Sequence, residues 1–359
     1  MVAWISEELV MASKRSGARW TALFSALLLA TGLVAACGPD QGSSGGTGAA
    51  GSTAGFPVTI EHLFGSTTIE RKPTRIVTLG GGDMEAAIAL DAVPTAGADW
   101  FGYTEPRTWV RDALAGRPAP QLIKADQVNF EQIAALRPDL ILYVNSKNEQ
   151  NTYGTLSRIA PTVAAPKGVD HLYGVPWVDQ VRTIAKATGT TAKGEEVVTG
   201  TQKVLSDAAK ANPEFAGKVA TAGVFSSGNY SIWMPSDPRM QLLTALGFKT
   251  NPAIDALDNG SFYVTLPREQ LAKMNSDLVF LAAGDQEGKV NPAVAGDPLF
   301  NSLPVAQGRH VAYFGGPGVI NTNSAEGAFS SAVSIGGPLG IKYVVDKLVP
   351  KLKNALAGK

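Results

Sequence analysis

The sequence has little cysteine, little histidine and no excess of charge of either sign, and each shortage excludes a class of site. Its 359 residues include one cysteine and three histidines, which are His62, His171 and His310. A single cysteine excludes an intramolecular disulfide and any cysteine-clustered zinc or iron–sulfur centre. Three scattered histidines argue against a histidine-rich metal centre. The 31 basic and 31 acidic side chains give zero formal net charge, so the composition predicts no nucleic-acid partner.

The composition is that of a folded chain. Hydrophobic residues make up 45% of the sequence and charged residues 17%, which argues against wholesale disorder because disordered chains are poor in apolar residues and rich in charge. At about 100–200 residues per domain, the length predicts two domains, each large enough for a sizeable core.

The N-terminus explains the single cysteine. Three basic residues within 14–19 precede an apolar run over residues 20–34. The run has about 15 residues, which is short of the ~20 that cross a bilayer and typical of a signal peptide. It ends Val-Ala-Ala-Cys at residues 34–37, which resembles a bacterial lipobox. We therefore expect a signal peptide over 1–36 and lipidation (palmitate) of Cys37; an ordinary cleaved signal with an incidental cysteine is the alternative.

The segment after the cysteine has the composition of a tether. Residues 38–55 are rich in Gly, Ser, Thr and Ala and carry almost no charge, which is typical of a flexible linker with an r.m.s. reach of roughly 23 Å. We expect residues 37–55 to hold the folded part at the outer face of the cell membrane. Glu7 and Glu8 suit a signal poorly, so translation is expected to start at Met11 or near it.

After Phe56, short apolar strands alternate with amphipathic helices, and this alternation predicts mostly parallel sheets with helices on both faces. Strands are expected at 75–79, 93–98, 121–123, 139–143, 219–225, 278–282 and 311–314. Helices are expected at 84–90, 130–136, 176–187, 191–210, 239–246, 268–274, 324–333 and 339–356.

An internal similarity indicates two related halves. Residues 130–142 and 268–280 match in helix, turn and strand at a constant offset of 138, and the long helix 191–210 lies between them. The fold class predicted is α/β, with two Rossmann-like lobes joined by a single long interlobe helix. The expected boundaries are 56–175 for the N-terminal lobe, 176–212 for the connecting helices, and 213–359 for the C-terminal lobe with its terminal helix.

Together, the lipobox, the tether, the strand Arg-Ile-Val-Thr-Leu at 75–79 and the element Asn-Phe-Glu-Gln-Ile-Ala-Ala-Leu-Arg-Pro-Asp-Leu at 129–140 resemble a class III substrate-binding protein. These proteins are receptors of ABC importers for ferric siderophores, haem and cobalamin. The resemblance covers about residues 57–355. It implies a monomeric, non-catalytic lipoprotein that captures a ferric siderophore in a cleft between its lobes and passes it to an ABC permease and its ATPase.

The resemblance also implies roles for two glutamates. In this family one glutamate on each lobe docks onto arginines of the permease, and by position these are Glu131 and Glu269. The alternative is that both are solvated glutamates in the first turn of a helix, where the helix dipole stabilises a negative charge.

Aromatic and polar residues on the strand-end loops are the candidate ligand contacts, since ligands of open α/β sheets bind at the carboxyl ends of the strands. Lys124 and Phe262 join them because family members place ligand contacts shortly before the two similar helices. The candidates are Trp100, Phe101, Tyr103, Lys124, Tyr143, Asn145, Tyr230, Trp233, Arg239, Phe262 and Phe314. Ferric-siderophore receptors often place arginine where this chain has Lys124, and lysine lacks the bidentate fork. A hydroxamate or a less charged chelate is therefore favoured over a tris-catecholate.

Several alternatives remain open. Arg107 and Arg111 are either further cationic contacts or a solvated helix face, and Trp109 and Trp177 are expected in the core. The cleft loops hold almost no histidine, which favours a chelated ion over a bare one. The protein itself is expected to bind no metal or cofactor. Haem could be held by Tyr143 or Tyr230, and cobalamin is a further candidate.

Two other function classes compete with a receptor. A cell-surface α/β enzyme is disfavoured because no G-x-G-x-x-G follows a strand and residues 80–83 lack the Gly-Lys-Ser/Thr of a phosphate loop. No convincing Ser/His/Asp set is present either. A scaffold or sensor lipoprotein is the third class.

Overall fold

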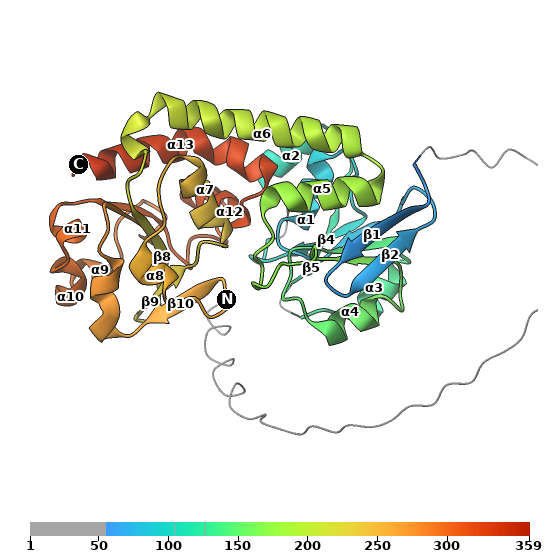
Figure 1. Cartoon of the computed structure of the whole chain (residues 1–359), viewed down its shortest axis with the longest axis horizontal. Helices are drawn as coiled ribbons and strands as arrows, with labels where there is room; N and C mark the ends of the chain where they lie inside the picture. Colours follow the sequence, from blue (N-terminus) through green and yellow to red (C-terminus); the bar gives the residue numbers. More distant parts are fainter. Residues whose placement is uncertain (1–54, 104, 126) are drawn as a thin grey trace, which may run out of the picture. The chain divides into compact units, whose positions relative to one another are not determined.

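The computed structural model describes residues 55–103, 105–125 and 127–359 (Figure 1). The predicted signal peptide, Cys37 and residues 38–54 of the tether lie outside the described residues.

The N-terminal lobe is built on a parallel sheet. An antiparallel hairpin, β1 (Val58–His62) and β2 (Gly65–Ile69), precedes it. The sheet has the order β5-β4-β3-β6-β7, with β3 at Ile76–Thr78, β4 at Ala96–Asp99, β5 at Gln121–Lys124, β6 at Leu140–Tyr143 and β7 at Thr162–Ala164. Its helices are α1 (Asp83–Ala89), α2 (Thr108–Leu114), α3 (Phe130–Ala135) and α4 (Gln150–Leu156). All neighbouring strands in this sheet are parallel, so all their carboxyl ends meet at one edge.

The sheet of the C-terminal lobe is mixed, which corrects the expectation of a mostly parallel sheet there. Its order is β10-β9-β8-β11-β12, with β8 at Ala220–Ser226, β9 at Asn229–Trp233, β10 at Tyr263–Leu266, β11 at Leu278–Gly284 and β12 at Val311–Gly315. Strands β8, β11 and β12 are parallel, while β9 and β10 run antiparallel to their neighbours. The reason is a two-residue hairpin at Ser227 and Gly228, both with positive φ, the conformation that such hairpins require.

Short helices complete this lobe, several beginning at a proline, which suits the first helical position because that residue needs no backbone N–H partner. They are η3 (Pro213–Phe215), α7 (Pro238–Ala245), α8 (Pro252–Asp255), η4 (Arg268–Met274), α9 (Pro292–Ala295), α10 (Pro298–Asn301), α11 (Pro304–Gln307) and α12 (Ala325–Ile335). The segment 268–274 is a 3₁₀ helix, whereas its counterpart α3 is an α-helix.

Helix α6 (Thr191–Ala211) connects the lobes along the chain, and α13 (Pro338–Leu356) packs against both of them. Helix α5 (Trp177–Thr188) leads into α6, the predicted interlobe helix, and α13 runs beside α6 and also packs on α1 and α2 (Figure 1). Trp109 of α2 lies with its ring 4.9 Å from that of Tyr343 of α13. One hydrophobic core therefore continues from the N-terminal lobe into the C-terminal lobe. Trp109 is in this core as expected, and Trp177 packs at its border.

None of the helices in the described residues combines the length and the apolar character needed to cross a bilayer.

Candidate functional site

The loop after β3 is shaped by one buried carboxylate. Asp83 accepts hydrogen bonds from the backbone N–H groups of Gly80 (3.1 Å) and Val144 (2.9 Å) and from the Gln180 amide (2.6 Å). A Cβ on Gly80 would lie 2.3 Å from an Asp83 oxygen, so only glycine fits there. Burial raises the pKa of Asp83 despite these bonds. The loops after β3 and β6 are thus fixed side by side at the carboxyl edge of the sheet.

A small cavity opens beside this loop, and we call it the N-lobe pocket. It measures about 30 Å³ and is lined by Gly82, Met84, Glu85, Ala98, Asp99, Trp100, Phe101, Tyr103, Pro106, Arg107, Val110, Leu122 and Ile335. The predicted ligand residues Trp100, Phe101 and Tyr103 therefore lie together. Ile335, at the end of α12, reaches the pocket from the C-terminal lobe, so the pocket lies where the two lobes meet.

Three residues that line the N-lobe pocket each have a buried polar atom without a hydrogen-bond partner among the described residues. These atoms are Glu85 Oε2, Trp100 Nε1 and Arg107 Nε. Glu85 is only 2% exposed, and its other oxygen accepts from Trp109 Nε1 at 3.2 Å. Burial raises the pKa of Glu85 to about 7. Buried polar groups without partners are rare in folded proteins, and three of the residues that carry one line this cavity, which makes it the candidate site.

The sequence interpretation missed Glu85. The available signal was its place beside the apolar residues Ala86, Ala87 and Ile88, all of which are buried in α1. An acidic residue on such a helix is costly to bury without a partner.

Arg107 joins the two lobes and is therefore not part of a solvated helix face. Arg107 donates to the carbonyls of Ile320 (2.9 Å) and Thr322 (2.6 Å) in the C-terminal lobe. Its guanidinium lies 3.4 Å from the centre of the Tyr103 ring, and the Tyr103 hydroxyl also donates to Ile320 at 2.7 Å. Burial raises the pKa of Tyr103 to about 12. Arg111, in contrast, is exposed and pairs with Glu105 at 3.4 Å.

A row of aromatic rings crosses from one lobe to the other beside the pocket. Trp100 contacts Tyr173 edge to face, with ring centres 5.3 Å apart, and Tyr173 contacts Phe262 in the same manner at 5.7 Å. Phe262 then contacts Tyr263 at 4.8 Å. Phe262 was predicted as a ligand residue; Tyr173 was not, because it lies in a loop with no periodic pattern. We call these four residues the aromatic row.

A histidine bridges the lobes next to this row. His171 Nε2 lies 2.9 Å from a carboxylate oxygen of Asp258 in the C-terminal lobe, and its Nδ1 lies 2.7 Å from Asp170. The hydrogen bond that the His171 imidazole makes to the Asp258 carboxylate is the main reason that the pKa of His171 is raised. The backbone N–H of Leu172 also donates to Gly260 across the lobes, at 3.4 Å.

The remaining N-lobe candidates have different surroundings. Lys124 is exposed at the end of β5, in register with Asp99. Asn145 is buried and supports the loop, since it donates to Gly81 O (3.1 Å) and accepts from Val175 N (3.2 Å). Tyr143 is 5% exposed and packs in the N-lobe core.

Two C-lobe candidates are also core residues, which is a further correction. Tyr230 is 2% exposed, donates to Asp297 at 3.1 Å and stacks on Phe300; burial beside Asp297 raises its pKa. Phe314 stacks on Phe280 with ring centres 4.1 Å apart. Alternate side chains of a strand point to opposite faces, and these two point into the lobe. A haem ligand from Tyr143 or Tyr230 loses its basis.

Trp233 and Arg239 form a separate contact. The Arg239 guanidinium lies 3.9 Å from the centre of the Trp233 ring and donates to Asp237 at 2.7 Å. Its charge is therefore paired with Asp237 within the described chain.

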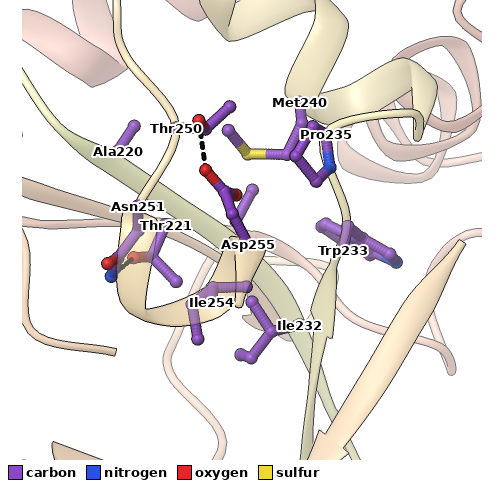
Figure 2. Close-up of a pocket in the computed structure, with 11 residues that line it drawn as sticks. Ala220, Thr221, Ile232, Trp233, Pro235, Met240, Thr250, Asn251, Ile254 and Asp255 are labelled. Carbon is purple, nitrogen blue, oxygen red and sulfur yellow. Dashed lines mark hydrogen bonds between the residues drawn. The ribbon is translucent and has the colours of Figure 1, made fainter. Parts of the chain in front are cut away.

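Trp233 also lines a second cavity, of about 10 Å³ (Figure 2). Figure 2 shows the hydroxyl of Thr250 donating a hydrogen bond to the Asp255 carboxylate (2.6 Å), and the Asn251 amide donates to the Thr221 hydroxyl (2.9 Å). At about the volume of one water, with these polar groups paired, this cavity is a gap in packing and not a ligand site.

The internal similarity has a structural counterpart. Asp139 accepts from the backbone N–H of Arg75 (2.7 Å), just before β3, and Asp277 accepts from that of Val219 (2.8 Å), just before β8. The two matched elements therefore make the same contact in each lobe. Glu131 and Glu269 lie in the first turns of α3 and η4, and both are exposed. Neither carboxylate forms an ion pair or a side-chain hydrogen bond with the rest of the described chain.

Comparisons with known proteins agree with this architecture. Residues 76–316 match the family described as periplasmic binding protein. The chain is 27% identical to the Fe(3+)-citrate-binding protein YfmC of Bacillus subtilis, over 76% of this chain and 83% of the relative. It is 29% identical to the probable siderophore-binding lipoprotein YfiY of the same organism, over 70% and 76%.

A solved structure supports the fold. The iron uptake ABC transporter substrate-binding protein PiaA of Streptococcus pneumoniae superimposes with a TM-score of 0.69 at 26% identity, covering 84% of this chain and 100% of that one. The predicted fold class and the resemblance to class III substrate-binding proteins are thereby confirmed.

Proposed function

The chain belongs to the periplasmic binding protein family, and we propose that it is a lipid-anchored receptor that captures a ferric siderophore between its lobes and delivers it to an ABC permease. The family consists of substrate-binding proteins of transporters and not of enzymes. YfmC is named as binding Fe(3+)-citrate, and YfiY is named as a probable siderophore-binding lipoprotein.

One observation carries the ligand proposal: the aromatic row meets the N-lobe pocket at the junction of the lobes. Aromatic rings supply large apolar area for an organic chelate, and the polar atoms at the pocket give it orientation. Trp100 belongs to both features, so a bound ferric chelate would quench its fluorescence.

The connection between the two lobes supports the receptor role. Helices α6 and α13 and the continuous core hold the lobes together, so the ligand would meet a largely formed site. A preformed site loses less entropy on binding than a mobile one.

The docking proposal rests on Glu131 and Glu269. Both are exposed and stand at the same place in two matched elements, one on each lobe. Two equivalent carboxylates suit a permease with two similar halves, and charge pairs of this kind act on encounter and orientation.

The anchor proposal rests on residues 34–37 and on the tether after them. It is tested by labelling cells with palmitate: Cys37→Ala should abolish labelling and release the chain from membranes. Unchanged labelling would contradict the anchor.

The ligand is tested by titrating the tryptophan fluorescence of the purified chain with hydroxamate, catecholate and mycobactin-type ferric siderophores, ferric citrate, haem and cobalamin. We expect saturable quenching by a ferric siderophore, with hydroxamates ahead of tris-catecholates. Saturation by haem or cobalamin alone would overturn the ferric-siderophore assignment.

A further inference from the structure

The unpartnered atoms of the N-lobe pocket define the chemistry of a complementary group. Glu85 Oε2 is an acceptor, while Trp100 Nε1 and Arg107 Nε are donors. A buried polar atom without a partner is destabilising unless a ligand or water pairs with it. The matching ligand therefore brings one strong donor and at least one acceptor into the same small space.

The other charged groups at the pocket already form hydrogen bonds with the backbone. Asp99 accepts from the backbone N–H groups of Phe101 (3.1 Å) and Tyr103 (2.7 Å). Arg107 directs its two terminal nitrogens to carbonyls of the C-terminal lobe. The pocket thus holds two carboxyl groups against one guanidinium whose positive charge faces those carbonyls. Glu85 has an unused carboxyl oxygen, and a positive charge beside that oxygen would hold Glu85 in its ionised form, so the pocket favours a cation over an anion.

We propose that Glu85 anchors a protonated amine on one arm of the ferric chelate, while Trp100 Nε1 and Arg107 Nε donate to a carbonyl beside that amine. This inference rests on the proposed function, because it concerns the same ligand. The cavity of about 30 Å³ has room for the tip of an arm and not for a whole chelate, whose bulk would lie against the aromatic row. The preferred substrate class is a linear ferric hydroxamate with a terminal ammonium group.

The geometry of Glu85 suits this role. Its side chain is 2% exposed, so an ammonium beside it would be shielded from water, where charge-assisted hydrogen bonds are strongest. Trp109 donates to the other oxygen at 3.2 Å, which restrains rotation of the carboxyl group.

The test compares two chelates that differ at one group. Ferrioxamine B carries a terminal ammonium, and its N-acetylated form binds iron in the same way without that charge. Both are titrated against the purified full chain by tryptophan fluorescence. We expect the wild-type chain to bind the ammonium form at least about tenfold more tightly.

Glu85→Gln keeps the size of the side chain and the acceptor for Trp109 but removes the charge. We expect it to reduce the preference for the ammonium form to less than about twofold, while Glu196→Gln, on the exposed surface of α6, leaves the preference unchanged. The wild-type comparison needs no variant, so it decides even if Glu85→Gln folds poorly.

The outcomes separate the two proposals. Equal binding of the two chelates by the wild-type chain, or an unchanged preference in Glu85→Gln, would overturn the role of Glu85 and leave the receptor function standing; it would mean that water alone fills the pocket. Binding of no ferric chelate of any class would overturn the receptor function and this inference with it.

Discussion

Arg107 of the N-terminal lobe donates a hydrogen bond to the main-chain carbonyl of Ile320 in the C-terminal lobe, at 2.9 Å. The same guanidinium donates to Thr322, so one buried side chain holds a loop of each lobe. His171, two residues before Tyr173 of the aromatic row, makes a second bridge with Asp258. Two side chains near the candidate ligand site therefore connect the lobes.

Arg107→Ala should lower the free energy of unfolding by about 2–3 kcal/mol, because it removes charged hydrogen bonds and leaves two carbonyls unpaired. Arg111→Ala is the matched control one turn away. Its ion pair with Glu105 is exposed on both sides and should contribute less than about 1 kcal/mol. Urea unfolding measures both. Equal effects of the two substitutions would contradict the bridging role of Arg107.

Glu85→Gln should stabilise the chain in a pH-dependent way. The pKa of Glu85 rises from an ordinary 4.5 to about 7 in the folded state, so folding favours the protonated carboxyl. Wild-type stability therefore falls as pH rises through this interval, by up to about 3 kcal/mol above pH 7. The variant should be more stable than wild type at pH 8 and gain nothing at pH 4.5.

Urea unfolding at the two pH values checks this, with Glu269→Gln as the exposed control. A variant that loses stability at pH 8 would show that the ionised carboxylate is well accommodated in the folded chain, against the cost argued here. The gain expected at pH 8 is also the sign of a site kept for function at the expense of stability.

His171→Gln should destabilise the chain more at low pH than at high pH. The folded pKa of His171 is raised above the ordinary 6.5 by Asp258 and Asp170. Its contribution is then fully present below pH 6.5 and is lost as pH rises through the higher folded value. The difference between wild type and variant should be larger at pH 5.5 than at pH 8.5, and Asp258→Asn should behave in the same way. A difference that grows with pH would exclude an ionic bridge.

The double substitution Glu131→Ala with Glu269→Ala should abolish uptake of the ferric ligand into cells while leaving its affinity for the purified chain unchanged. The reason is that both carboxylates are exposed and free of ion pairs within the described residues, so their loss removes docking and not binding. Glu196→Ala, whose exposed carboxylate pairs with Lys193 at 3.1 Å, is the control. A large loss of ligand affinity would sink the docking assignment.

Periodic elements were predictable from the sequence because burial dictates their pattern. The helix expected at 191–210 is found at Thr191–Ala211, and the strand expected at 139–143 is found at Leu140–Tyr143. The repeated elements share the contact of Asp139 and Asp277 with the start of a strand, although their helices differ in type. The spacing of apolar residues depends on near neighbours in the sequence, and the helices and strands of the described residues follow that spacing.

The site was less predictable, because its residues come together through packing between distant segments. Tyr173 and Phe262 are 89 positions apart in sequence and meet only through the lobe contact. Tyr230 and Phe314 lie at strand ends as expected, but their side chains face the lobe interior, and sequence alone does not decide which face a short buried strand turns inward. Glu85 lies in the short helix α1, and it is buried because α2 packs against it through Trp109. The sequence of α1 alone does not predict this contact.

The central claim is that a ferric chelate binds at the aromatic row, and the most direct measurement is a fluorescence titration of wild type, Trp100→Phe and Trp177→Phe with one ferric hydroxamate. Trp177, at the border of the core, serves as the control. The account predicts saturable quenching in wild type and in Trp177→Phe, with the larger part of the quenching lost in Trp100→Phe. Quenching that is unchanged when Trp100 is replaced would contradict it.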